Sequence, residues 1–266
     1  MATPKGLIVY EGPSMINGAP IVVIATLKTD NPKTGNTIQT WILHRDIHPV
    51  NAVNTGDDEA ICGDCPLRGI IMDWKHKTKK TGDEKPGDTV NKGRGCYVRI
   101  ATGPRAVWQA YKNGNYTPYN ASKHLSLFAG RVLRLGSYGE PVAIPYAVMS
   151  PMMRVAKATI GYTHQWRLGK YWRWRKSCMA SVHSIAERHE AMAMGWRTFR
   201  TRLEGQPLEA GEFICPASPE GNNRLDCERC KACGGGRPEQ ASPVIIAHGG
   251  DSKITGITNT ILAATA

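Results

Sequence analysis

The stretch that decides the fold is GRVLRLGSYGEPVAIPYAVMSPMMRVAKATIGYTH, residues 130–164. It runs from an apolar, β-branched segment through a helical segment that contains Pro151 to a second apolar segment ending at His164. Strand, helix, strand in this order predicts a parallel βα unit. Downstream, strands are expected at "SCMASV", "WRTFRTR", "EFICPA" and "PVIIAHGG", and a helix at "SIAERHEAMAMG", where Ser184 and Glu187 form a capping box. These units are too few for an eightfold barrel, so we expect an α/β fold with a partial or open parallel barrel.

The rest of the chain divides by composition. Residues 1–50 hold β-branched runs separated by turn formers, which predict an antiparallel β-hairpin region with "GLIVY" as a third strand. Residues 51–103 form a cysteine-containing basic region, whose lysine-rich part at 75–94 lacks periodicity and is interpreted as a mobile loop. The parallel βα domain then spans 104–252, beginning with a short helix at "GPRAVWQAYKNG". Residues 253–266 form a tail with little pattern.

Charge narrows the possible partners. The 266 residues include 34 Lys and Arg against 22 Asp and Glu, a formal net charge of +12. Such a field attracts polyanions, among which nucleic acid is the commonest in a cell, although a merely soluble basic surface explains the charge equally well. No apolar stretch approaches the ~20 residues that cross a bilayer, and no signal peptide is visible. We therefore expect a cytoplasmic protein with no membrane partner (in the host cytoplasm if phage-encoded) and with reduced thiols that serve as metal ligands.

Four of the eight cysteines lie in "CPASPEGNNRLDCERCKACGGG", residues 215–236, with the spacing C-x11-C-x2-C-x2-C. Thiolates two residues apart can face one metal, and Asn222 and Asn223 allow the intervening loop to turn sharply. Four thiolates suit tetrahedral zinc or an iron–sulfur cluster equally well. We predict a metal knuckle here, mainly structural in role, with these ligands: Cys215, Cys227, Cys230 and Cys233.

A second set of cysteines, Cys62, Cys65 and Cys96, supplies three thiolates with the spacing C-x2-C-x30-C. Three thiolates around one open position is what a substrate-binding [4Fe–4S] cluster or a catalytic zinc requires. A structural site completed by a fourth ligand is at least as good an interpretation, and His76 and Cys178 are the residues that we consider for that place.

Polar residues follow the predicted parallel strands where such folds keep their chemistry. Gly139 and Glu140 follow the first strand, His164 follows the second, and His183 follows the third. A carboxylate and imidazoles that meet at one mouth serve general acid–base catalysis or ligand binding. We therefore take Glu140, His164 and His183 as the candidate catalytic residues.

The segment "HQWRLGKYWRWRKS", residues 164–177, interleaves cations with flat rings. Cations contact phosphates and rings stack on bases in the recognition of single strands and flipped bases. The plainer interpretation is an amphipathic segment with tryptophans packed inward and solvated cations. The candidate nucleic-acid contacts are Trp166, Arg167, Lys170, Trp172, Arg173, Trp174, Arg175 and Lys176.

Two resemblances arise from these motifs. The combination of "ICGDCP", "CYV", "GYTHQW", "GWRTFR" and the 215–236 segment resembles a group of phage-type cysteine-rich proteins that have no established activity. A cysteine loop ending in Cys-Tyr, then a helix, then a strand closing in Gly-Glu-Pro, resembles the order in radical S-adenosylmethionine enzymes. That likeness implies a [4Fe–4S] cluster on the upstream cysteines, S-adenosylmethionine contacted by Gly139 and Glu140, and an auxiliary cluster on the downstream cysteines.

Two functions are consistent with these observations. The first is a metal-dependent α/β enzyme of phage type, using iron–sulfur or zinc, that modifies nucleic acid or nucleotides. The second is a non-catalytic, zinc-stabilised protein that binds nucleic acid by charge and stacking.

Overall fold

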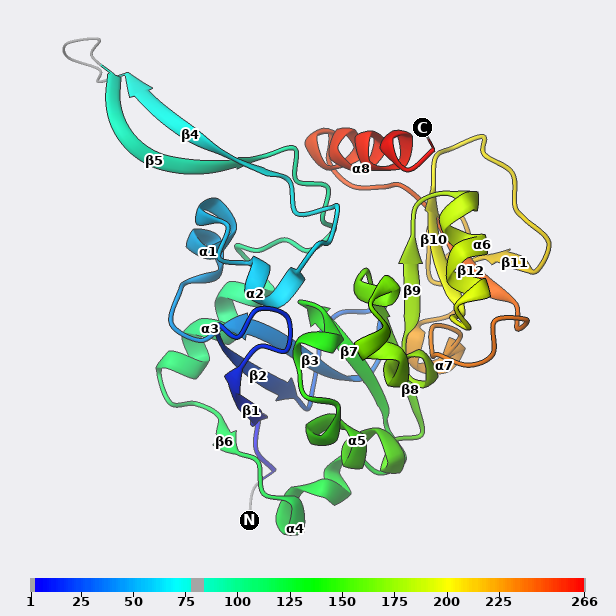
Figure 1. Ribbon diagram of the computed structural model, residues 1–266. Coiled ribbons are helices and arrows are strands. Elements are labelled where there is room, and N and C mark those ends of the chain that lie inside the picture. The colour runs from blue at the N-terminus through cyan, green and yellow to red at the C-terminus, as the bar shows by residue number, and fades with distance from the viewer. Residues whose placement is uncertain (1–2, 78–83, 266) are drawn as a thin grey trace.

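The computed structural model describes residues 3–77 and 84–265, without the side chains of residues 73–88 and 90. Its main sheet is built from these strands: β1 (Gly6–Pro13), β2 (Pro20–Thr26), β3 (Ile38–His44), β6 (Thr117–Pro118), β7 (Val132–Tyr138), β8 (Ala158–Thr163), β9 (Met179–Val182), β10 (Thr198–Arg202), β11 (Glu212–Ile214) and β12 (Ser242–Ile246). Their order in the sheet is β11-β12-β10-β9-β8-β7-β3-β2-β1-β6 (Figure 1). The order has two edges, β11 and β6, as expected for an open sheet.

The direction of the strands confirms the predicted α/β class. All neighbours in the sheet are parallel except β1–β2 and β2–β3. The antiparallel hairpin predicted for residues 1–50 is β2–β3, with β1 as the third strand. Because β3 pairs in parallel with β7, the N-terminal strands and the βα strands share one sheet.

Eight α-helices and four 3-10 segments accompany the sheets in the described residues. They are α1 (Pro49–Thr55), α2 (Glu59–Cys62), α3 (Gly103–Lys112), α4 (Ala121–His124), η1 (Leu125–Phe128), η2 (Pro141–Ala143), α5 (Tyr146–Val155), η3 (Gln165–Arg167), η4 (Gly169–Lys176), α6 (Ile185–Ala193), α7 (Cys227–Cys230) and α8 (Asp251–Ala263). The Ser184 hydroxyl accepts from the Glu187 N–H at 3.0 Å, which confirms the predicted cap of α6. Helix α5 continues through Pro151 rather than restarting there.

One part of the sequence-based prediction was wrong, and a second segment, for which little pattern was found, proves to have structure. The stretch interpreted as an aperiodic basic loop contains an antiparallel hairpin, β4 (Ile70–Lys77) and β5 (Glu84–Lys92), which projects from the body in Figure 1. Residues 78–83 of that stretch lie outside the described residues. The tail also has structure, because α8 packs Ile257 and Ile261 on Leu67, beside the upstream cysteines.

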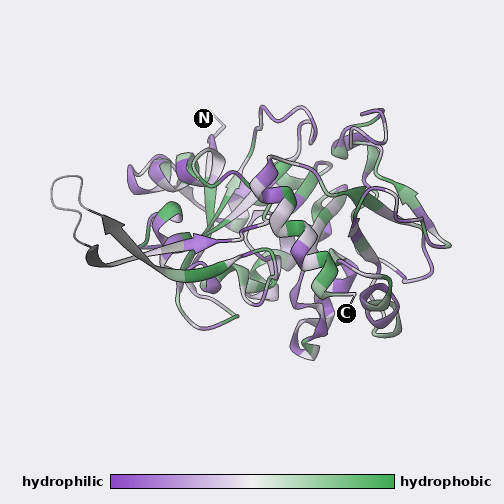
Figure 2. Cartoon of the chain, turned by 90° about the horizontal axis from the view of Figure 1, so that it is seen from above, coloured by the Kyte–Doolittle hydropathy of each residue, from purple (hydrophilic) through white to green (hydrophobic). Residues whose placement is uncertain are grey.

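Strand β7 separates two apolar cores. Side chains alternate across a strand, so Leu133 and Leu135 join the large core beneath β1–β3. Val132 points the other way, into a small core with Phe199 and others. The strands near the centre of Figure 2 carry much of the green that marks hydrophobic residues. Arg134 therefore lies on the Val132 face of the strand, which is the face that carries the cavities described below.

No helix within residues 3–77 and 84–265 has both the length and the apolar character needed to span a lipid bilayer.

Candidate functional site

Glu140 is fixed by a tight turn at the carboxyl end of β7. Gly139 has φ +82°, and a Cβ on it would lie 2.8 Å from the Cβ of Ile42, so this turn admits only glycine without strain. The Glu140 N–H donates to the carbonyl of Ile61 at 2.6 Å. The turn thus holds the carboxylate beside helix α2, which ends at the first cysteine of the upstream set.

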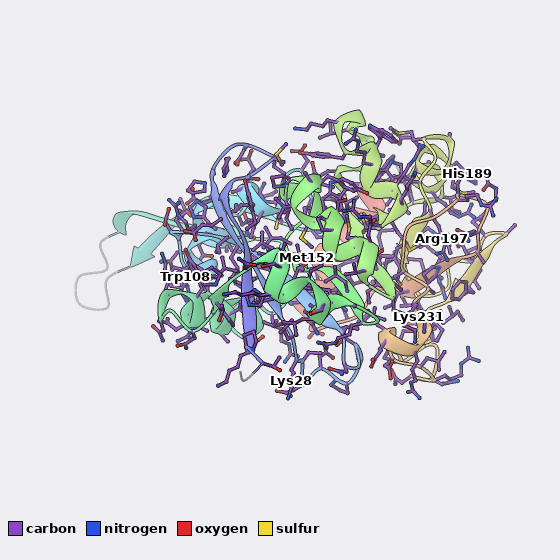
Figure 3. All side chains as sticks on the ribbon, turned by 90° about the horizontal axis from the view of Figure 1, so that it is seen from below. Lys28, Trp108, Met152, His189, Arg197 and Lys231 are labelled. Carbon is purple, nitrogen blue, oxygen red and sulfur yellow. The ribbon has the colours of Figure 1, made fainter. Side chains whose placement is uncertain are left out.

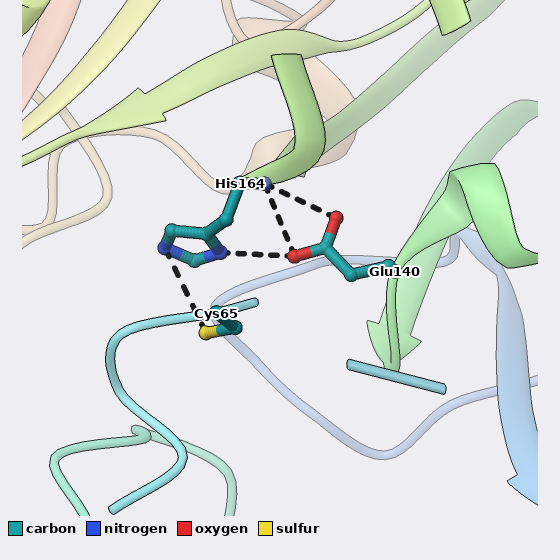
Figure 4. Close-up of side chains that lie close together, drawn as sticks. All are labelled: Cys65, Glu140 and His164. Atoms are coloured by element: carbon teal, nitrogen blue, oxygen red, sulfur yellow. Dashed lines mark hydrogen bonds and ion pairs between the residues drawn. The ribbon is translucent and has the colours of Figure 1, made fainter. Parts of the chain in front are cut away.

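Glu140 and His164 form the centre of the site (Figure 4). Both carboxylate oxygens accept from the His164 backbone N–H at 3.1 Å, and Oε1 accepts from Nδ1 of its ring at 2.9 Å. The carboxylate is nearly buried, with 6% of Glu140 exposed. A carboxylate bound to one ring nitrogen fixes the orientation and tautomer of the imidazole. Nε2 of His164 is therefore the atom left for chemistry.

His183 lies beside His164 and extends the pair. The two rings are stacked, with centroids 5.4 Å apart, and their Nε2 atoms are 3.2 Å apart. Because Nδ1 of His164 donates to Glu140, its Nε2 accepts, and Nε2 of His183 is the donor. Burial, with the neighbouring His164 charge, lowers the pKa of His183 to about 3, so this ring is neutral at physiological pH. Its Nδ1 is buried, and no described residue bonds to it.

Cys65 completes a set of three metal-ligand types. Its Sγ lies 3.9 Å from Nε2 of His164, on the side of the ring away from Glu140 (Figure 4). In the described part of the chain, Cys65, Glu140 and His164 are the group of candidate ligands whose atoms all lie within 4.8 Å of one another. Thiolate, carboxylate and imidazole around an open position resemble the ligand sets of catalytic zinc.

Cys62 and Cys96 lie near Cys65 but outside that compact group. All three thiols line one cavity of about 180 Å³, together with Glu140 and His164. Burial is the main reason that the pKa of Cys62 and of Cys65 lies well above the ordinary value. Buried thiols become thiolates when a metal binds them.

Arg94 supplies a positive charge to these thiols. Burial alone would lower its pKa, but Cys96, Tyr138 and Cys62 raise it above the ordinary value. The guanidinium Nη1 bonds to Asp58 at 3.2 Å, whereas Nε and Nη2 are buried without a partner among the described residues. These two guanidinium N–H groups without a partner would balance the negative charge that the three thiols acquire when they bind a metal.

A larger cavity of about 670 Å³ adjoins the small one over the same face of the sheet. The residues common to the linings of both are Tyr97, Val98, Arg134, Ser137, Tyr162 and Phe199. Cys215 and Cys227 also line the larger cavity. The two cysteine sets therefore line adjoining cavities that share six residues.

The C-terminal cysteines lie in the connection between the neighbouring strands β11 and β12. The backbone turns sharply at Asn222, Asn223 and Lys231, with φ of +60°, +49° and +55°. Burial raises the pKa of Cys233 to about 12, and the other thiols of the segment add to this effect. No three of the four sulfurs fall within 4.8 Å of one another in the described structure, whereas zinc-bound sulfurs are roughly 3.8 Å apart. The backbone of the segment turns sharply, but its four sulfurs are further apart than those of a zinc site.

The proposed fourth ligands of the upstream set differ in outcome. Cys178 is buried in the large core, and its thiol donates to the Trp174 carbonyl at 3.4 Å. The side chain of His76 lies outside the described residues. All eight cysteines are free of disulfides.

The basic-aromatic segment is only partly available to a ligand. Trp166 and Trp174 are 1% and 2% exposed, so neither ring can stack on a base, and this part of the prediction was wrong. Their indoles fill the core because the segment forms 3-10 turns, η3 and η4, against the sheet. Trp172 is 49% exposed. The cations Arg167, Lys170, Arg173 and Lys176 are exposed, and Arg175 is half-buried.

Comparison with known proteins adds no relative: no family model matches the chain, and no curated protein or solved structure matches it either. The geometry of the cysteines, Glu140 and His164 is therefore the basis for assigning a function.

Sequence reasoning missed two cations of the site, Arg94 and Arg134. Arg134 stands in "VLRLGSY", where a charged residue interrupts an apolar strand, and that interruption was the available indication. Arg94 lies in a lysine-rich stretch where nothing distinguishes it from solvated neighbours.

Proposed function

We propose that the protein is a metal-dependent enzyme of phage type that acts in the cytoplasm on nucleic acid or nucleotides. Cys62, Cys65 and Cys96 would hold the metal centre, and Glu140 and His164 would work beside it. The observation that carries this proposal is the shared cavity, which brings three thiols, a carboxylate and an imidazole to the carboxyl ends of parallel strands. We also propose that strands β7–β10 curve around that cavity as a partial or open barrel.

The residues of the site would have different roles. Glu140 orients His164. Nε2 of His164 accepts from neutral His183 in this structure, so His183 would have to turn aside before that nitrogen took a proton or a metal. Arg94 balances the charge of the thiolates. A bound iron–sulfur cluster would supply electron transfer, and a bound zinc would supply a Lewis acid.

The two metals use different residues. A single zinc would bind Cys65 and Nε2 of His164, with Glu140 orienting the ring from Nδ1. A cluster has one thiolate on each of three irons and so needs the sulfurs further apart, and the sulfurs of Cys62, Cys65 and Cys96 do not all lie within 4.8 Å of one another. In the cluster version, S-adenosylmethionine would occupy the hollow beside Gly139 and Glu140. The upstream cysteines have the spacing C-x2-C-x30-C, whereas radical S-adenosylmethionine enzymes have C-x3-C-x2-C. Measurement of the bound metal therefore distinguishes a cluster from zinc.

Metal content tests the proposal directly. Protein purified without oxygen is analysed for iron, sulfide and zinc, and compared with Cys65→Ala and Cys178→Ala. Both variants remove a free thiol, but only Cys65 belongs to the site. We expect Cys65→Ala to lose the upstream metal and Cys178→Ala to keep it. Wild-type protein without metal, or full metal content in Cys65→Ala, would exclude the proposed centre. A Cys227→Ala variant separates the contribution of the knuckle, for which we propose a structural zinc or an auxiliary cluster.

The alternative function is a non-catalytic, zinc-stabilised nucleic-acid-binding protein, and one surface favours it. Trp172 is exposed, and the guanidinium carbons of Arg173 and Arg175 lie 5.7 Å and 5.6 Å from its ring centre. Stacking of one base on such a ring contributes about 1–3 kcal/mol. Trp172→Ala should then weaken binding of a single-stranded oligonucleotide by roughly 5- to 160-fold, while Glu140→Gln leaves it unchanged. Equal affinity of wild type and Trp172→Ala would eliminate this surface.

A further inference from the structure

The larger cavity has a lining of one sign of charge. Its volume of about 670 Å³ lies within the range of sites for small molecules. The charged side chains of its lining are Lys33, Arg99 and Arg134, and its described lining includes no Asp or Glu. A hollow whose lining carries Lys and Arg but no carboxylate attracts anions.

Arg134 is the cation at the centre of this hollow, because it lines the larger and the smaller cavity alike. It is half-buried on the Val132 face of β7, and within the described structure its guanidinium has no ion pair or hydrogen bond. A partly desolvated guanidinium is stabilised by a nearby anion. Arg134 acts electrostatically on Cys227, and a phosphate bound in the cavity would supply a further negative charge. Lys33 and Arg99 are exposed and stand at the rim.

The same hollow has an aromatic wall. Tyr162 and Phe199 lie with ring centroids 4.3 Å apart and planes at 36°, and both line the two cavities. Ser137, 8% exposed, lines both cavities, and its hydroxyl has no partner among the described residues. Both rings also pack in the small core, so only the parts that face the cavities are open to contact with a base, and the hydroxyl offers a donor and an acceptor.

We propose that this cavity binds a nucleoside monophosphate. The phosphate would contact Arg134, with Lys33 or Arg99 at the rim, and the base would lie against Tyr162 and Phe199. This inference rests on the proposed function and names its substrate class as a mononucleotide rather than a strand held by the basic-aromatic segment. Since Arg134 also lines the thiol cavity, the bound nucleotide would lie next to Glu140 and His164.

Calorimetric titration of the purified protein, with its metals in place, tests the inference. The probes are the four nucleoside 5′-monophosphates, the matching nucleosides and inorganic phosphate. We expect at least one monophosphate to bind ten or more times more tightly than its nucleoside and than phosphate alone. Arg134→Gln should abolish that difference. Arg154→Gln, which removes the same charge from α5 (the helix that carries Met152 in Figure 3), should leave it intact.

Further variants keep the test decisive. Lys33→Gln alters an exposed rim residue and should weaken the monophosphate about threefold even if Arg134→Gln does not fold. Equal binding of nucleoside and monophosphate, or unchanged affinity in both variants, would overturn the inference. So would an oligonucleotide that binds tightly while its monophosphates do not. Metal content is measured on the same samples: protein without metal that still binds the monophosphate contradicts the proposed enzyme but not this cavity.

Discussion

At the scale of single residues, Gly139 decides where Glu140 lies. Alanine there must adopt φ +82° and bring its Cβ to 2.8 Å from Ile42. The left-handed backbone costs about 1–2 kcal/mol and the crowding about 1–3 kcal/mol more. We expect Gly139→Ala to lower the free energy of unfolding by about 2–5 kcal/mol, measured by urea denaturation.

Gly130→Ala is the matched control for this variant. Gly130 has φ +71°, but a methyl group added to its Cα would meet no atom within 4 Å, so alanine there bears only the backbone cost of about 1–2 kcal/mol. If the two variants lose equal stability, the contact of Gly139 with Ile42 does not constrain the turn.

At the scale of elements, α8 holds the loop that carries Cys96. A Cβ on Gly256 would lie 2.5 Å from the carbonyl oxygen of Gly93, so helix and loop touch backbone to backbone. Lys253 adds a bond from Nζ to the Tyr97 carbonyl at 3.0 Å. The helix therefore acts as a clamp on the upstream thiols.

Gly256→Ala should loosen this clamp although alanine favours helix by about 1 kcal/mol. We expect faster hydrogen exchange in α8 and around Cys96, with at least half of the upstream metal lost. Gly169→Ala, in η4, serves as the control, because a Cβ there meets nothing within 4 Å and the position lies outside α8, so neither readout should change. Unchanged exchange in Gly256→Ala would show that α8 does not depend on this contact.

These elements also show what could be predicted from the sequence. The strands were predicted because apolar, β-branched runs alternate with turn formers. Glu140, His164 and His183 were placed at one mouth because the carboxyl ends of parallel strands share an edge. Contact between His164 and Cys65 was not predictable, since it joins residues 99 positions apart across a loop without periodicity.

Other elements were hidden by composition. Ile254, Ile257 and Ile261 of α8 recur at helical spacing, but the surrounding Thr and Ile residues have weak helix propensity. The β4–β5 hairpin contains too few alternating apolar residues to predict strands, and only the pairing of its two halves reveals it. The burial of Trp166 and Trp174 follows from 3-10 turns, whose period neither a helix nor a strand pattern matches.

At the scale of the whole molecule, the two parts of the sheet are held in different ways. The large apolar core lies under β1–β3, β7 and their helices, whereas the small core beside β8–β10 has five buried residues. The edge formed by β10, β12 and β11 depends instead on buried charge: the side chains of Arg200 and Glu212 are 2% and 0% exposed and pair at 2.5 Å.

This difference makes the C-terminal part of the sheet sensitive to acid. Burial alone would raise the pKa of Glu212, but bonds to Arg200 and the Glu209 backbone hold it below its ordinary value of about 4.3. A carboxylate whose pKa is lowered by folding stabilises the fold fully above its unfolded-state pKa. This contribution is lost as the pH falls through the folded-state pKa. We expect stability to decline below about pH 4.3.

Glu212→Gln tests the origin of this decline. Breaking a buried pair costs about 3–5 kcal/mol at neutral pH, and the deficit relative to wild type should shrink toward pH 3. Asp46→Asn removes an exposed pair with Arg45 and should cost less than about 1 kcal/mol. A constant deficit of Glu212→Gln from pH 7 to pH 3 would exclude Glu212 as the acid-sensitive group.

Because the two cysteine sets lie far apart along the chain, they emerge from the ribosome at different times. Cys62 and Cys65 leave the ribosome about 120 residues before His183, roughly 6–24 s at ordinary rates of translation. Until β7, β8 and β9 have formed beside β3, nothing encloses these two thiols, and they are open to oxidation and to the wrong metal. Cys215 to Cys233 emerge within about one to four seconds of each other. If both proposed metal sites exist, the C-terminal segment would bind its metal during synthesis, whereas the upstream site would bind its own only after β7–β9 have formed.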